Sequence, residues 1–256
     1  MAIFKFNKRS PIFPAPLDPS TTQLAVKLGA LKQLGLSPLS TCESLGIRLS
    51  GLDDVYTSLQ TLLSSKPLQE VLSANPQGNL IDDVLDASMN LIDFCDTVRG
   101  LLGRFRCRIE ALECALRRRK GYSNWAMDVA DYVCFRKQMK KEAKKIMKRR
   151  QGKDIEIAQE NCWTEMGLVR EVNGINLCIL NSLVGLLSSS KWGRLSSENE
   201  IERVDKAVGE RRVDYEATER DLRNLEKRIE KMEKSLESVG RGIIRIRASM
   251  LNIISR

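Results

Sequence analysis

The side chains best suited to chemistry in this sequence are cations gathered in one stretch. Between Arg99 and Lys153 there are eighteen Lys and Arg residues and only five acidic ones, a local net charge of +13. The whole chain carries +9, so the remaining residues sum to −4. Because phosphates and carboxylates are the groups that Lys and Arg bind, this concentration of charge predicts contact with an anionic partner.

These cations form two clusters. The first stands at the end of a predicted helix, where the helix dipole favours positive charge. Its members are Arg117, Arg118, Arg119 and Lys120. The second cluster runs along another predicted helix and consists of Arg136, Lys137, Lys140, Lys141, Lys144, Lys145, Lys148, Arg149 and Arg150. Both clusters are candidate sites for binding a polyanion or a protein partner.

Several interpretations of the second cluster stay open. It could contact nucleic-acid phosphates, anionic lipid headgroups or the nuclear import machinery. It could also be a solvated face that neutralises the Glu-rich segment 198–237. Nucleic acid is the less favoured partner, because Tyr132 and Phe135 fall on the predicted buried side of the helix and cannot stack on bases. We therefore expect an acidic protein or an anionic membrane surface.

The sequence lacks the residues of most enzyme chemistry. It contains no histidine, which removes the commonest general base and the usual partner of a nucleophilic Ser or Cys. Its seven cysteines are widely spaced without a C-x-x-C pair, and we interpret them as free thiols. No phosphate-binding P-loop is present. We expect a protein that is not an enzyme, with no catalytic residue, no metal and no cofactor.

The rest of the composition favours helices as the elements that position the cations. Aromatic residues make up 5% of the chain, and four of its seven prolines stand among the first twenty residues. We expect residues 1–20 to form a flexible Pro-rich arm and residues 21–256 to form a single helical-bundle domain. The expected helices cover about 22–34, 50–66, 79–118, 124–151 and 154–187, followed by a long segment from 198.

Two helix starts are assigned from capping residues. Ser50, with Asp53 three residues later, predicts a helix start after a loop over residues 36–49. Ser197, with Glu200, predicts a capping box that opens the last and longest helical segment.

The last segment carries the strongest periodic signal. Apolar residues recur there at three- and four-residue steps over five heptads, as in coiled coils. They are Leu222, Leu225, Ile229, Met232, Leu236, Val239, Ile243, Ile246, Met250 and Ile253. We expect this stripe to pack on helix 80–118 of the same chain, which favours a monomer. The predicted fold class is all-α: an elongated, mainly antiparallel bundle of long amphipathic helices with a coiled-coil-like C-terminal segment.

The predicted helix 124–151 is amphipathic, so one side can pack while its lysines face solvent. Its inward stripe is Trp125, Val129, Tyr132, Phe135, Met139, Ala143 and Ile146. No run of eighteen uninterrupted apolar residues occurs in the chain, and we interpret the apolar stretch 175–187 as a buried core helix.

Several short motifs together resemble a known family. They are Leu49-Ser-Gly-Leu-Asp-Asp-Val-Tyr, Leu80-Ile-Asp-Asp-Val-Leu-Asp, Leu91-Ile-Asp-Phe-Cys-Asp, Ala115-Leu-Arg-Arg-Arg-Lys-Gly, Phe135-Arg-Lys-Gln-Met-Lys-Lys-Glu and Gly242-Ile-Ile-Arg-Ile-Arg-Ala-Ser-Met-Leu-Asn-Ile-Ile. The combination is similar to the plant-specific family labelled domain of unknown function 241, related to the Bypass proteins, over about residues 45–256. The resemblance implies a cytoplasmic plant protein in a family associated with root and shoot development, and it brings no catalytic residue.

Together these features predict a non-enzymatic helical interaction or regulatory protein. It would act through helix–helix contacts, including the C-terminal heptads, and through its basic face. The alternative is a peripheral membrane or polyanion-binding protein that uses the basic helix 136–150. The expected location is the cytoplasm, with nuclear or membrane-peripheral placement as alternatives.

Overall fold

The computed structural model of this chain describes residues 19–35, 41–74, 79–118, 125–151, 165–188, 199–210 and 214–255. Within these ranges nearly every residue is helical and no strand occurs, which confirms the all-α prediction. The helices are α1 (Pro19–Gly35), α2 (Cys42–Leu63), α3 (Lys66–Ala74), α4 (Asn79–Arg118), α5 (Trp125–Gln151), α6 (Glu165–Ser188), α7 (Glu200–Gly209) and α8 (Tyr215–Ile254).

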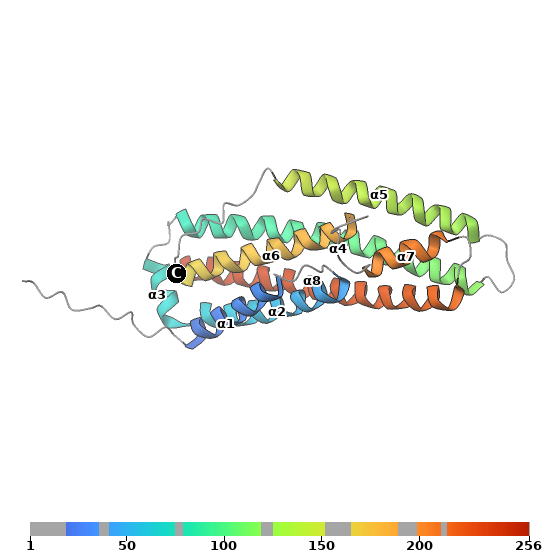
Figure 1. Cartoon of the computed structure of the whole chain (residues 1–256). Coiled ribbons are helices and arrows are strands. Elements are labelled where there is room, and N and C mark those ends of the chain that lie inside the picture. The colour runs from blue at the N-terminus through green and yellow to red at the C-terminus, as the bar shows by residue number, and fades with distance from the viewer. Residues whose placement is uncertain are drawn as a thin grey trace, which may run out of the picture.

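Helices α4 and α8 form the spine of an elongated bundle (Figure 1). Each is 40 residues long, which corresponds to about 60 Å. They run antiparallel, because contacts join the start of one to the end of the other. The Arg247 guanidinium donates to the Leu85 carbonyl near one end. Arg106 pairs with Glu233 at 2.7 Å further along, and Arg223 pairs with Glu113 at 3.0 Å near the other end.

Helix α2 runs parallel to α8 and packs on a side of α8 that α4 does not cover. Its start is tied to Arg228 through Glu43 at 2.9 Å, and its end to Ser249 through Gln60 at 2.9 Å. All ten heptad residues of α8 are buried, and α8 packs mainly on α4 and α2. The stripe therefore packs inside the chain, against α4 as expected and also against α2.

Helix α6 completes the core by packing on α4, α2 and α5. Residues 167–188 are long and apolar enough to cross a membrane by length and composition, with a mean hydropathy of 1.2, but 61% of that window is buried inside the bundle. A buried hydrogen bond of 2.9 Å joins the Asn176 amide to the Tyr56 hydroxyl of α2. These contacts are those of a core helix, as the sequence predicted.

Helix α2 begins eight residues earlier than the sequence predicted. Residues 42–49 were expected in a loop with Ser50 as the cap, but they are helical, and Thr41 caps them. Thr41 and Ser44 exchange side-chain hydrogen bonds with each other's backbone N–H groups, at 3.1 and 3.0 Å. The prediction was wrong because the N3 residue of this capping box is a serine instead of the usual Glu or Gln, so the box was not recognised in the sequence. Gly51 admits Leu31 of α1, whose side chain would lie 2.8 Å from an added Cβ.

The last predicted segment is two helices, not one. Asn199 caps α7 in a capping box with Glu202, whose backbone N–H donates to the Asn199 Oδ1 atom at 2.8 Å. The predicted cap, Ser197, lies outside the described residues. α7 ends at Gly209, and Asp214 caps the separate helix α8. An Asp in N-cap geometry favours a new helix start over a continuous one. Of the predicted arm over 1–20, residues 1–18 lie outside the described residues, and Pro19 and Ser20 belong to α1 instead of the arm.

Candidate functional site

The candidate site is on α5, the outermost long helix along one edge of the bundle (Figure 1). It packs on α6 and α4 and touches α7. Its predicted inward stripe is confirmed, since Tyr132, Met139 and Ala143 are buried and the other four members pack partly against the core. The inward stripe fixes which side of α5 faces solvent.

The opposite side of α5 carries lysines. With about 100° between successive residues, Lys137, Lys141, Lys144 and Lys148 fall within an arc of about 60°, facing away from the buried stripe. All four are exposed, as are the flanking Lys145 and Arg149. We call the following six residues the basic face of α5: Lys137, Lys141, Lys144, Lys145, Lys148 and Arg149.

No acid in the described part of the chain neutralises the basic face. None of its six cations forms an ion pair or hydrogen bond with a described residue. The acid within the same stretch, Glu142, is taken by Arg104 of α4 at 2.7 Å. The basic face therefore presents six positive charges to solvent without an internal counter-charge from these residues.

Two predicted site residues face α7 instead. The Arg136 guanidinium, 4% exposed, pairs with Asp205 at 2.9 Å, and Lys140 reaches the same carboxylate at 3.2 Å. Tyr132 donates its hydroxyl proton to Asp205 at 2.7 Å. Arg136 also donates to the Leu187 carbonyl at 3.3 Å. We call Tyr132, Arg136, Lys140 and Asp205 the Asp205 cluster; it joins α5 to α7 and removes Arg136 from the surface.

The surroundings of the Asp205 cluster shift the pKa values of Asp205 and Tyr132 in opposite directions. Burial alone would raise the pKa of Asp205, but the hydrogen bonds and positive charge of its partners outweigh burial and hold that pKa below its usual value. Burial, reinforced by the carboxylate, raises the pKa of Tyr132 well above its usual value, so the phenol stays protonated and can donate. The cluster is a structural connection between α5 and α7.

Of the remaining predicted site residues, two make contacts within the bundle, one is exposed and two are not described by the structure. Arg150 lies over the Phe94 ring of α4, 3.9 Å from its centroid, and burial lowers its pKa. Arg117 pairs with Glu113 at 2.5 Å. Arg118 is exposed and has no ion pair within the described ranges. Arg119 and Lys120 lie outside those ranges. Arg150 and Arg117 thus make contacts within the bundle, and the exposed charge gathers on the basic face.

The Glu-rich part of α8, which the sequence suggested as an internal counter-charge, is engaged elsewhere. Glu230 and Glu237 pair with Lys234 and Arg241 of the same helix, each at 2.6 Å. Glu219 pairs with Arg223, and Glu233 pairs with Arg106 of α4. Among the described residues, the acid outside α5 that pairs with cations of α5 is Asp205 of α7, which lies within the predicted segment 198–237, although the sequence reasoning named only glutamates of that segment as candidates.

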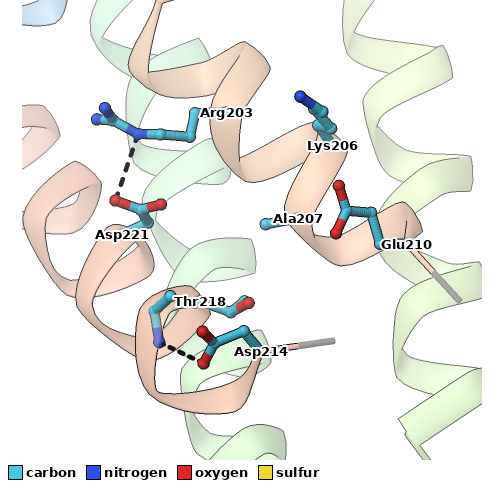
Figure 2. A pocket seen from close by; sticks show the side chains of 8 residues that line it. Arg203, Lys206, Ala207, Glu210, Asp214, Thr218 and Asp221 are labelled. Carbon is cyan, nitrogen blue, oxygen red and sulfur yellow. Dashed lines mark hydrogen bonds and ion pairs between the residues drawn. The ribbon is translucent and has the colours of Figure 1, made fainter. Parts of the chain in front are cut away.

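A pocket of about 180 Å³ lies between α7 and the start of α8 (Figure 2). Its lining carries both signs of charge, and an ion pair of 3.3 Å between Arg203 and Asp221 crosses it. The volume is below the roughly 300 Å³ of small-molecule sites. In the described residues, no group of three or more acidic or Cys side chains is placed to hold a metal ion. The pocket therefore does not displace the basic face as the candidate site.

Comparisons with known proteins give one informative result. A family model described as Protein BPS1 matches residues 48–253, from α2 nearly to the end of α8. The match confirms the resemblance to the Bypass-related plant family that the sequence motifs indicated. A search of curated proteins and a search of solved structures gave no match.

Proposed function

We propose that this chain, which belongs to the BPS1 family, is a non-enzymatic regulator that binds an anionic partner through the basic face of α5. The family assignment suggests a role as a developmental regulator in plants, and we extend it to the control of root and shoot development from the cytoplasm. The observation that carries the proposal is the contrast within α5: Arg136, Lys140 and Arg150 have partners in the bundle, while the six cations of the basic face have none among the described residues.

Energetics support a partner outside the chain. Lys137, Lys141 and Lys145 follow one another at four-residue steps, as do Lys144 and Lys148. Each such like-charge pair destabilises a helix by a few tenths of a kcal/mol. The helix dipole offsets this repulsion only in the last turn. The fold therefore carries a small cost for the basic face, and an anionic partner would relieve it.

The C-terminal heptads contribute less to the proposal than the sequence suggested. Their ten apolar residues are buried in the chain between α2 and α4. An intermolecular helix–helix contact through that stripe would require α8 to leave its neighbours. The basic face needs no such rearrangement, so binding is assigned to α5.

The test is charge reversal with a matched control. Lys141→Glu, Lys144→Glu and Lys148→Glu together should abolish binding to immobilised polyglutamate and to phosphatidylserine vesicles without lowering the melting temperature. The control carries the same change in net charge on α8, at the exposed residues Lys227, Lys231 and Arg245, and should bind nearly as the wild type does. Equal losses in both triple variants, or no loss in either, would contradict the proposal.

A further inference from the structure

The N-terminal half of α5 also has an outer side, and the exposed side chains there are uncharged. Before the basic face begins, the exposed residues on this side are Ala126, Met127, Ala130, Val133 and Cys134, which we call the apolar patch. Met127 is 66% exposed and Val133 38%. Single exposed apolar side chains are common on protein surfaces and need no explanation. The arrangement of these five relative to the lysines is what carries information.

The apolar patch and the basic face share one direction. At about 100° per residue, the five residues of the patch fall within an arc of about 120°, and its centre coincides within about 10° with that of Lys137, Lys141, Lys144 and Lys148. The acids of the first half, Asp128 and Asp131, lie outside that arc. The outer side of α5 is therefore one strip, about 35 Å long, whose first part is apolar and whose second part is cationic.

We propose that this strip docks on a membrane surface that contains anionic phospholipid. The lysines would contact the phosphate and carboxylate groups of the lipids, and Met127 and Val133 would enter the boundary between headgroups and acyl chains. This inference rests on the proposed function, since it assigns the anionic partner of the same face. The partner is identified by its chemistry: an extended anionic layer with an apolar interior a few ångströms below it.

Two features favour a lipid surface over an acidic protein. The strip lies on the outermost helix, so a broad surface can reach its whole length (Figure 1). The pocket between α7 and the start of α8 does not include α5 residues, and the strip itself follows the convex outer side of a single helix. A protein ligand recognised by shape normally enters a groove or pocket, whereas a lipid layer adapts to a convex helix and accepts long lysine side chains along it.

The bundle presents the strip without unfolding. The Asp205 cluster fixes one flank of α5 to α7, and Arg150 over Phe94 fixes its end to α4. The cations on the flanks thus hold the helix, and the outward ones stay available. Docking requires only an approach of the intact bundle, so the full chain is the right material for the test.

The decisive variant removes the apolar part and keeps the charge. Met127→Gln with Val133→Gln should weaken binding to vesicles of phosphatidylcholine and phosphatidylserine by about tenfold, and leave binding to polyglutamate unchanged. The matched control is Ile244→Gln with Leu251→Gln, at α8 side chains that are 53% and 41% exposed, which should bind vesicles as the wild type does. The triple lysine variant should lose at least about 100-fold on the same vesicles. Vesicles of phosphatidylcholine alone should bind no variant.

The outcomes separate the inference from the proposed function. If the wild type binds polyglutamate but not anionic vesicles, or if the Met127/Val133 variant binds vesicles as tightly as the wild type, the membrane inference fails and the proposed function stands. If the triple lysine variant keeps its binding to both probes, both proposals fail. Added salt provides a second criterion: it should weaken the contribution of the lysines and leave the difference made by Met127 and Val133 intact.

Discussion

Helices α5 and α8 are both long, amphipathic and rich in charge, yet they use their charges differently. α8 carries nine bases and seven acids, and several of them pair along the helix or with α4. α5 carries nine bases and three acids, and its outward cations stay without a described partner. Interspersed signs let much of the charge on α8 pair within the bundle, although Lys227, Lys231 and Arg245 have no ion pair with a described residue. Segregated charge on an outer helix leaves an interaction for another molecule to complete.

The largest effect is expected in the apolar stripe of α8. Ile229 is fully buried, so Ile229→Asp would place an unpaired charge in the core and should lower the free energy of unfolding by more than about 4 kcal/mol. Urea titration measures the loss, and Lys227→Asp, at an exposed position two residues earlier, is the control. Sedimentation should give a monomer for the wild type. A wild-type dimer that the variant splits into folded monomers would show that the stripe works between chains.

The second effect concerns the connection of α5 to α7. Asp205→Ala leaves the buried Arg136 without its carboxylate and should cost about 3 kcal/mol, at the low end for a broken buried pair because the Leu187 carbonyl still accepts a hydrogen bond from Arg136. The double variant Arg136→Met with Asp205→Leu should recover most of that loss, since it removes both charges. Chemical denaturation of the wild type, the single variants Arg136→Met and Asp205→Leu and the double variant gives the coupling energy. A double variant as unstable as Asp205→Ala would mean that the pair is not the source of the loss.

The third effect is the pH dependence of the same cluster. Because the pKa of Asp205 is held below its usual value in the fold, its contribution to stability is present above about pH 4, the pKa of an unfolded Asp. That contribution is lost as the pH falls through the lower folded-state pKa. Asp205→Asn should therefore be less stable at neutral pH and lose less stability on acidification. Parallel acid profiles for the wild type and Asp205→Asn would refute this linkage, whatever the other carboxylates contribute.

The parts of this comparison that were predictable from the sequence are those that a helical period determines. The inward stripe of α5, its outward lysines and the ten buried positions of α8 all follow from three- and four-residue spacing. At about 100° per residue the period also places Arg136 within the arc of the inward stripe and Lys140 about 20° beyond it, but it does not say which acid these two cations meet. Asp205 of α7 pairs with both cations, and nothing local to Asp205 marks it as their partner. The break before α8 was missed for a related reason, since an Asp cap inside a charged segment looks like one more exposed acid.

The smallest expected effect is on stability: a single charge reversal should stabilise the protein when made on α5 and destabilise it when made on α8. Lys141 has lysines at positions 137, 144 and 145, three or four residues away on α5. Lys141→Glu replaces repulsion by attraction and should stabilise the protein by about 0.5 kcal/mol at low salt. Lys234 of α8 pairs with Glu230 at 2.6 Å and has Glu237 three residues later. Lys234→Glu should therefore lower the melting temperature. Both shifts should shrink as salt screens exposed charges.

Measuring vesicle binding by the same two variants tests whether the stability cost of the basic face is linked to function. If Lys141→Glu raises the melting temperature and also weakens binding to anionic vesicles, the basic face costs stability in return for binding. Lys234→Glu should lower the melting temperature with little change in binding. If the two reversals shift stability in the same direction, or if Lys141→Glu binds vesicles as the wild type does, then α5 and α8 are equivalent solvated surfaces and the contrast between them carries no function.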